Sequence, residues 1–356
     1  MSTITRASVV IATYNGEKYI EQQLLSIINQ SVKPYEIIIS DDNSKDNTLS
    51  ICQRIINENY TDDIKIRLLK NDVNNKEIAN NFENGFKHVT GQVVFLCDQD
   101  DIWMPNKIET MLELMNKTKK KLAFHNAEII LENESGGYDK TGRTLFENNG
   151  LQALSGESTI LDRERYYPIS LRFCFIQGMC ICIDAEYLRS ILPLSEYKNH
   201  DDWLLFCAMF DDSVAATGKI LSYYRIHSSN NAGLAQYKKK KTLAEKINDF
   251  EKQSYASINN LYGWSKDVAD YAENEKIPDD NINRIYEFYK INRINALKKH
   301  KLAALASLND LKKQGVYEID GKIMFYHDLL FCTFKSARKR KKIIESICSS
   351  YKSRIQ

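Results

Sequence analysis

Three carboxylates stand within four residues at Asp98, Gln99, Asp100 and Asp101, directly after the apolar run 93–97. Carboxylates this close repel one another and lose hydration beside a buried strand, which costs stability unless a cation or hydrogen-bond donors compensate. Their oxygens suit hard divalent cations such as Mg²⁺ or Mn²⁺. A cation held there could bridge two phosphates and neutralise the charge of a departing diphosphate. An exposed acidic turn with Asn106 or Asp101 capping the next helix explains the same residues equally well.

Two earlier apolar runs end in polar residues in the same way. Thr13, Tyr14 and Asn15 follow the first of these runs. Asp41 and Asp42 follow the second. The Tyr14 ring could stack on a nucleobase, and a carboxylate of Asp41 or Asp42 could accept a hydrogen bond from a base N–H group. Turn and capping chemistry explains Asp42 and its neighbours without any ligand.

Two acids, Asp201 and Asp202, stand at the start of a predicted helix, and His227 follows a predicted strand. Acids at a helix start commonly cap it, because the helix dipole is positive there. One of these carboxylates could instead take a proton from a substrate hydroxyl. His227 could ligate a metal or contact phosphate, although a lone histidine is more often structural.

The elements that must position these residues alternate between short strands and amphipathic helices. This alternation predicts an α/β fold with an open, mostly parallel sheet flanked by helices and joined by right-handed crossovers. Ligands of such sheets bind beyond the carboxyl ends of the strands, where the polar clusters stand. The expected strands are 7–12, 37–40, 64–68, 93–97 and 219–226, and the expected helices include 17–29 and 77–88.

The rest of the chain gives weaker signals. Residues 129–172 are rich in Glu, Asn and Gly, and we expect loops there near an acceptor cleft. Residues 173–183 are apolar and favour a strand. After about residue 236 the spacing becomes helical, and 236–356 contains 25 Lys and Arg against 15 Asp and Glu. We therefore expect one domain over 1–235 and a basic helical C-terminal region over 236–356.

Composition is that of an ordinary soluble protein, with 356 residues, 43% hydrophobic and 27% charged. No basic and apolar leader opens the chain, and no run approaches the roughly 18 apolar residues that span a bilayer. None of the eight cysteines forms a CxxC pair, so buried reduced thiols are expected. These features favour a cytoplasmic protein.

Taken in order, the polar motifs resemble a known family. Segments of the first 103 residues look like the nucleotide-sugar domain of family 2 glycosyltransferases, which have the GT-A fold; these are 8–15, 39–44 and 97–103. Further segments resemble the rhamnosyltransferase-like bacterial branch, namely 98–103, 200–204 and 224–230. The resemblance covers roughly residues 5–232.

The resemblance implies an inverting sugar transfer that uses Mn²⁺ or Mg²⁺. Asp98 and Asp100 match the DxD pair, with Asp100 touching the metal and Asp98 nearer the ribose, and Asp42 would bind uracil or thymine. Asp201 best matches the position of the family's catalytic base, which takes the proton of the acceptor hydroxyl. Asp202 stands where this branch often has an aromatic residue, so it remains the second choice for the base.

The full set of expected contacts follows from both arguments. The donor, dTDP-rhamnose or a UDP-sugar, is expected to contact Thr13, Tyr14, Asn15, Asp42, Asp98 and Gln99. The metal is expected at Asp100 and His227, with Asp98 as a further possible ligand. The acceptor would be a saccharide, often lipid-linked in this family, in the synthesis of bacterial surface polysaccharide such as O-antigen or capsule.

Two basic clusters, 238–241 and 338–342, could hold the protein at the inner face of the plasma membrane. Anionic lipid attracts such clusters by roughly 1 kcal/mol per Lys or Arg near the surface. A solvated helical face explains them equally well. Nucleic acid is not an expected partner, because no groove-reading motif accompanies the basic runs.

Three rival functions fit parts of the sequence. A sugar-nucleotide pyrophosphorylase would need a Gly-rich loop bearing Arg or Lys after the first strand, and residues 13–17 are not such a loop. A haloacid-dehalogenase-type phosphatase would carry its nucleophile after that strand, where this sequence has Thr13, Tyr14 and Asn15 instead. A non-catalytic partner with a transferase-like domain would bind nucleotide or polysaccharide without turnover.

Overall fold

The computed structural model describes most of the first 227 residues and parts of the remainder. The described residues are 5–59, 63–71, 78–133, 136–170, 174–227, 264, 267–268, 270–271, 299 and 301–313. The chain divides into two compact units, 1–194 with 199–238 and 195–198 with 239–356. Every candidate site residue lies in the first unit. Both basic clusters, 238–241 and 338–342, lie outside the described residues.

The described residues of the first unit build a ten-stranded mixed sheet in the order β3-β2-β1-β4-β9-β6-β10-β5, with β7 on β6 and β8 on β10. Its first four strands in this order are parallel to one another. They are β1 (Ala7–Thr13), β2 (Glu36–Asp41), β3 (Lys65–Lys70) and β4 (Val93–Asp98). This half confirms the predicted parallel sheet.

The second half of the sheet is mixed. β9 (Ile181–Asp184) runs antiparallel to both of its neighbours, whereas β6 (Leu122–Glu132) and β10 (Val214–Ile226) are parallel to each other. Three antiparallel strands complete it: β5 (Ile102–Trp103), β7 (Tyr138–Thr144) and β8 (Thr159–Ile160).

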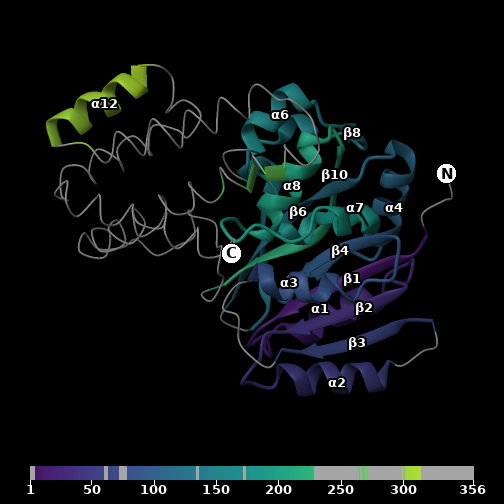
Figure 1. Ribbon diagram of the computed structural model, residues 1–356. Coiled ribbons are helices and arrows are strands. Elements are labelled where there is room, and N and C mark those ends of the chain that lie inside the picture. The colour runs from purple at the N-terminus through teal and green to yellow at the C-terminus, as the bar shows by residue number, and fades with distance from the viewer. Residues whose placement is uncertain are drawn as a thin grey trace. The chain divides into compact units, whose positions relative to one another are not determined.

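Helices cover both faces of the sheet (Figure 1). Val9 and Ile11 of β1 join the core cluster that includes residues of α1, α2 and α4. Val10 points to the other face, where a side chain on Gly85 of α3 would collide with it, so Gly85 lets α3 approach the sheet closely. The helices are α1 (Ile20–Ile28), α2 (Thr48–Glu58), α3 (Ile78–Phe86), α4 (Lys107–Thr118), α5 (Leu145–Asn148), α6 (Arg163–Ser170), α7 (Ala185–Ser190) and α8 (His200–Phe210).

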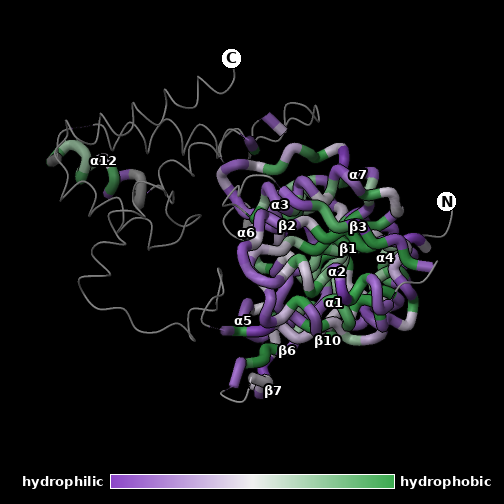
Figure 2. Tube along the Cα trace, turned by 90° about the horizontal axis from the view of Figure 1, so that it is seen from below, coloured by the Kyte–Doolittle hydropathy of each residue, from purple (hydrophilic) through white to green (hydrophobic). Residues whose placement is uncertain are grey.

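The double covering explains why the central residues of these strands form continuous apolar runs. All six residues of β2 are buried, and so are five of the six in β4. Figure 2 shows the corresponding hydrophobic segments inside the unit and hydrophilic segments around them. Strands buried on both faces lack the alternation of half-buried strands, which is why they stood out in the sequence.

The expectation of loops over 129–172 was wrong. β6 continues to Glu132, β7 forms a hairpin with it, and α5, β8 and α6 follow. β7 carries mostly polar residues and none of them is buried, so it gave no hydrophobic signal. The strand expected over 173–183 is shorter: η2 (Gly178–Cys180) is a 3₁₀ turn, and β9 begins at Ile181.

The second unit is described in part. Its helix α12 (Lys301–Lys313) includes the buried residues Ala304 and Leu308. Among the described residues of the chain, no helix is both long enough and apolar enough to cross a lipid bilayer.

Candidate active site

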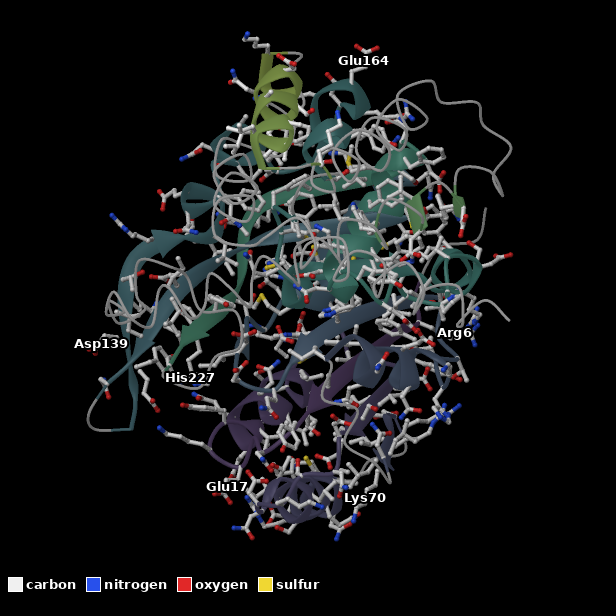
Figure 3. The ribbon with its side chains drawn as sticks, turned by 60° about the vertical axis from the view of Figure 1, so that its left-hand side comes forward. Arg6, Glu17, Lys70, Asp139, Glu164 and His227 are labelled. Atoms are coloured by element: carbon white, nitrogen blue, oxygen red, sulfur yellow. The ribbon has the colours of Figure 1, made fainter. Side chains whose placement is uncertain are left out.

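The register of the parallel strands places three polar clusters at one edge of the sheet. Thr13 pairs with Asp41 of β2, and Ala12 pairs with Asp98 of β4. β10 ends at Ile226, so His227 follows it directly. Figure 3 shows His227 and Glu17 at one end of the domain and Arg6, which precedes β1, at the other. The sheet therefore gathers these residues as its carboxyl ends should.

The carboxylate of Asp41 is engaged in hydrogen bonds within the protein. Asp41 is fully buried, and its carboxylate accepts hydrogen bonds from Thr13 Oγ1 at 2.9 Å and from Ser44 N at 2.8 Å. The backbone N–H of Asp42 donates to Thr13 O at 2.9 Å. Asp41 therefore holds the loops after β1 and β2 together, and Asp42 stays the candidate for contact with a nucleobase.

The loop after β1 is fixed by side chains from other loops. Tyr14 N–H donates to Gln99 Oε1 at 2.9 Å, Asn15 N–H to Ser44 Oγ at 2.9 Å, and Gly16 N–H to Thr48 Oγ1 at 2.7 Å. Asn15 has a positive φ of 48°, which an asparagine tolerates better than most residues. The Tyr14 side chain is 46% exposed, so its ring is available to a ligand.

The acidic cluster carries strongly perturbed carboxyls. Burial, then the charges of Asp100 and Asp201, raise the pKa of Asp98 to about 7. Burial, then the charges of Asp100 and Asp98, raise the pKa of Asp101 well above its ordinary value. Asp101 Oδ1 accepts from Arg225 N–H at 2.9 Å, whereas its buried Oδ2 has no hydrogen-bond partner in the described part of the chain. Such crowding of negative charge favours a bound cation.

Asp100 is held by two residues from β10 and its end. His227 Nε2 lies 2.9 Å from Asp100 Oδ2, and Arg225 Nε donates to Asp100 O at 2.8 Å. The His227 ring also lies against the Tyr19 ring, with 4.5 Å between centroids. Arg225, near the end of β10, and His227, just after the strand, therefore both reach the same acid.

The proposed base stands near this cluster. Asp201 and Asp202 lie in the first turn of α8, and the charge of Asp201 acts on Asp98. Asp201 Oδ1 accepts from Asp202 N–H at 3.0 Å. Asp202 is buried, whereas Asp201 keeps partial exposure. Asp201 is therefore the better placed of the two to face a substrate.

Comparison with known proteins decides the family. The model of glycosyl transferase family 2 matches residues 8–179. This segment is a family 2 glycosyltransferase domain. The match includes Asp42 and the acidic cluster, while Asp201 and His227 lie beyond its end.

Relatives of the domain are bacterial glycosyltransferases. The UDP-Glc:α-D-GlcNAc-diphosphoundecaprenol β-1,3-glucosyltransferase WfgD of Escherichia coli is 26% identical over 281 residues, which cover 76% of this chain and 98% of that protein. The dTDP-rhamnosyl transferase RfbG of Shigella flexneri is 36% identical over 140 residues, but these cover 38% of this chain and 45% of RfbG.

A solved structure confirms the GT-A fold of the family 2 domain. Residues 1–349 of Staphylococcus aureus TarS superpose with a TM-score of 0.55 at 15% identity, covering 98% of this chain and 91% of that one. This likeness concerns the fold alone. The predicted fold class and the predicted glycosyltransferase family are therefore both confirmed.

The chemistry of the site fits a divalent cation. No group of three or more His, Cys, Asp or Glu side chains suited to a metal lies among the described residues, so Asp98 does not join Asp100 and His227 in one. However, Mg²⁺ usually binds one or two protein groups together with substrate phosphates and water. Asp100 supplies one such group, a carboxylate, and the neighbouring His227 imidazole is a nitrogen ligand that Mn²⁺ accepts.

Sequence reasoning missed a buried lysine near the acidic cluster of the glycosyltransferase domain. Lys107 of α4 is fully buried, donates from Nζ to Met179 O at 2.8 Å and lies 3.7 Å from the centre of the Trp103 ring. Burial lowers its pKa to about 8, while Asp101 is among the groups that raise it. A lysine at a helix start gives no sequence signal of burial, so only the packing reveals this role.

Proposed function

We propose that the protein is an inverting glycosyltransferase that moves a sugar from a nucleotide-sugar to a hydroxyl of a saccharide acceptor. One observation carries the proposal: Asp98, at the carboxyl edge of the sheet where β4 ends, lies within reach of the charges of Asp100 in the following loop and of Asp201 in α8. A nucleotide-sugar needs such an edge for its diphosphate, and the transfer needs a carboxylate beside it.

In the proposed complex the donor lies across three loops. The nucleobase of the donor would lie against Tyr14 and Asp42, with Thr13 and Asn15 shaping the loop around it. The ribose would lie near Asp98. Asp100 and His227 would hold Mn²⁺ or Mg²⁺, which supplies charge neutralisation of the diphosphate when bound. These roles agree with the contacts that hold Asp100 and His227 together.

For the reaction itself we assign the base to Asp201. Its carboxylate takes the proton of the acceptor hydroxyl, whose oxygen forms the new bond to the anomeric carbon. The bond from that carbon to the diphosphate oxygen breaks, and the nucleoside diphosphate leaves from the opposite face. Alignment of the two substrates and this proton transfer together lower the barrier, the base by a factor of about 10²–10⁴.

The names of two relatives support a proposal for the substrate class. WfgD is named for a UDP-glucose donor and an undecaprenol-linked acceptor, and RfbG for dTDP-rhamnose. We therefore propose a UDP-sugar or dTDP-rhamnose as donor and a lipid-linked saccharide as acceptor, in the synthesis of bacterial surface polysaccharide. Such an acceptor would place the protein at the cytoplasmic face of the plasma membrane, with the clusters 238–241 and 338–342 as candidate lipid contacts.

The test is release of nucleoside diphosphate from a panel of UDP-sugars, GDP-mannose and dTDP-rhamnose, with Mn²⁺ and with chelator. We expect metal-dependent release from a UDP-sugar or dTDP-rhamnose, increased by an undecaprenol-linked saccharide. Tight binding of the donor without any release would favour a non-catalytic binding protein. For membrane contact, neutralising Arg338–Lys342 should weaken binding to vesicles containing anionic lipid.

A further inference from the structure

We propose that Gln99 is a positioning residue that fixes the base loop, residues 13–16, against the acidic loop, residues 98–101, and that it does not bind the sugar. The inference rests on the proposed function, in which the base loop contacts the nucleobase and the acidic loop faces the diphosphate. Gln99 was expected from the sequence to contact the donor directly, so this assignment changes its role.

Both the oxygen and the nitrogen of the Gln99 side-chain amide form hydrogen bonds with the backbone of Tyr14. Gln99 Oε1 accepts from Tyr14 N–H at 2.9 Å, and Gln99 Nε2 donates to Tyr14 O at 3.0 Å. The backbone pairing of β1 with β4 ends at Ala12 and Asp98. The amide of Gln99 therefore extends this pairing past the end of both strands, by two bonds to the peptide groups of Tyr14.

Gly16 provides the space for this contact. A Cβ on Gly16 would collide with Gln99 Oε1, so any larger residue would push the amide away from Tyr14. Gly16 has no positive φ in the structure, and its role is therefore space and not backbone conformation. The amide is the flexible end of a side chain, so a methyl group here should displace the amide and leave the backbone in place.

The rest of the base loop is fixed to α2 and the loop before it. Ser44, Thr48 and Asp46 accept the N–H groups of the three residues after Tyr14. Gln99 provides the corresponding bond on the side of the acidic loop. A donor has a fixed distance between its base and its diphosphate, so the two loops must be correctly spaced before it binds. Loosening this bond should reduce affinity, because binding must then order the loops.

A second glutamine, at the opposite end of β4, offers a matched control. Gln92, just before β4, also accepts backbone N–H groups beside β1: Thr5 N at 3.1 Å and Arg6 N at 3.2 Å. It lies at the amino edge of the sheet, away from the site. Gln92→Met and Gln99→Met each remove a glutamine-to-backbone contact between the same two strands, but only one of them connects the two site loops.

The experiment measures binding of UDP and dTDP, and of the matching nucleotide-sugars, to the full chain with Mn²⁺ by calorimetry. We expect Gln99→Met and Gly16→Ala each to weaken binding of the diphosphate about 10-fold, because an ordering cost of about 1.4 kcal/mol corresponds to that factor. The double variant should lose less than the two losses added together, since both changes break one contact. Gln92→Met should bind as the wild type does.

The outcomes separate this role from the alternatives. An equal loss for the diphosphate and for the nucleotide-sugar supports positioning, whereas a loss confined to the nucleotide-sugar would make Gln99 a sugar ligand and overturn it. Unchanged affinity in both Gln99→Met and Gly16→Ala would also overturn it while leaving the proposed function intact. Absence of nucleotide binding in the wild type would overturn the proposed function together with this role. If Gln99→Met does not fold, Gly16→Ala decides.

Discussion

His227 Nε2 lies 2.9 Å from Asp100 Oδ2, although 127 positions separate the two residues in the sequence. The end of β10 thus meets the loop after β4, two strands that are not neighbours in the sheet. Family resemblance suggested Asp100 as a metal ligand, and side-chain chemistry suggested His227 independently. Their contact gives that suggestion a geometry, and it leads to the first of four predictions.

Replacing His227 with Ala should weaken Mn²⁺ binding and reduce donor turnover. Loss of a ligand, or of the group that orients one, typically costs about 10–100-fold in metal affinity. The check is Mn²⁺ binding followed by electron paramagnetic resonance in the presence of UDP, with turnover measured in parallel. His88→Ala, at an exposed histidine after α3, serves as the control. Unchanged Mn²⁺ affinity in His227→Ala would remove His227 from the metal site.

Replacing Asp201 with Asn should abolish most of the turnover while donor binding persists. We expect kcat to fall by about 10²–10⁴, the usual contribution of a general base. The kcat of Asp202→Asn should fall less, because Asp202 is buried whereas Asp201, in the same first turn of α8, is partly exposed. The measurement is kcat at saturating donor together with the Kd for UDP. A larger loss in Asp202→Asn than in Asp201→Asn would reverse the assignment.

Replacing Arg225 with Lys should disturb Asp100 even though the charge is kept. Arg225 donates from Nε to Asp100 O and from a terminal nitrogen to Gln22 Oε1 at 2.6 Å, and its guanidinium lies over the rings of Tyr19 and Tyr138. A lysine ammonium cannot reproduce this planar fork. We expect Mn²⁺ affinity to fall about 10-fold, as for other groups that orient a metal ligand.

The control for that change is Arg163→Lys. Arg163 also donates from Nε to a carbonyl, Phe210 O at 2.9 Å, and lies against the rings of Tyr167 and Phe210. Its loss should lower thermal stability without changing Mn²⁺ affinity. Equal Mn²⁺ affinities for the two arginine variants would show that Arg225 only stabilises the fold.

Replacing Asp98 with Asn should stabilise the metal-free protein at high pH. The folded-state pKa of Asp98, about 7, lies above the ordinary value of 3.8, so the folded state holds the proton more tightly than the unfolded chain. Stability therefore falls as pH rises from about 4 to about 7. Because Asp98 is partly exposed, we expect a gain of only about 1–2 kcal/mol for Asp98→Asn at pH 8.

The measurement for Asp98 is the free energy of unfolding in urea at several pH values, with chelator present. The stabilisation should grow between pH 5 and pH 8 and shrink when Mn²⁺ and UDP are added. Glu164→Gln, at an exposed acid of α6, should show neither trend. A pH-independent difference between wild type and Asp98→Asn would mean that Asp98 ionises as it does in water.

The sequence by itself determined the parallel half of the sheet and the edge that carries the site. Strands such as β2 and β4 are buried on both faces, so continuous apolar runs in the sequence indicate them. Because these strands are parallel, the polar residues after each run lie at the same carboxyl edge of the sheet. The motifs in segments 8–15, 39–44 and 97–103, taken in order, were sufficient to suggest the family, and the match over residues 8–179 confirmed it.

Only the tertiary structure decided how these residues are held. The β6–β7 hairpin escaped the sequence because no residue of β7 is buried, and Lys107 escaped because burial of a charge depends on neighbours far along the chain. Gln99 reaches Tyr14 across 85 positions, and Arg225 reaches Asp100 across 125. Contacts at such separations depend on strand order and register, which local hydrophobic periodicity does not encode.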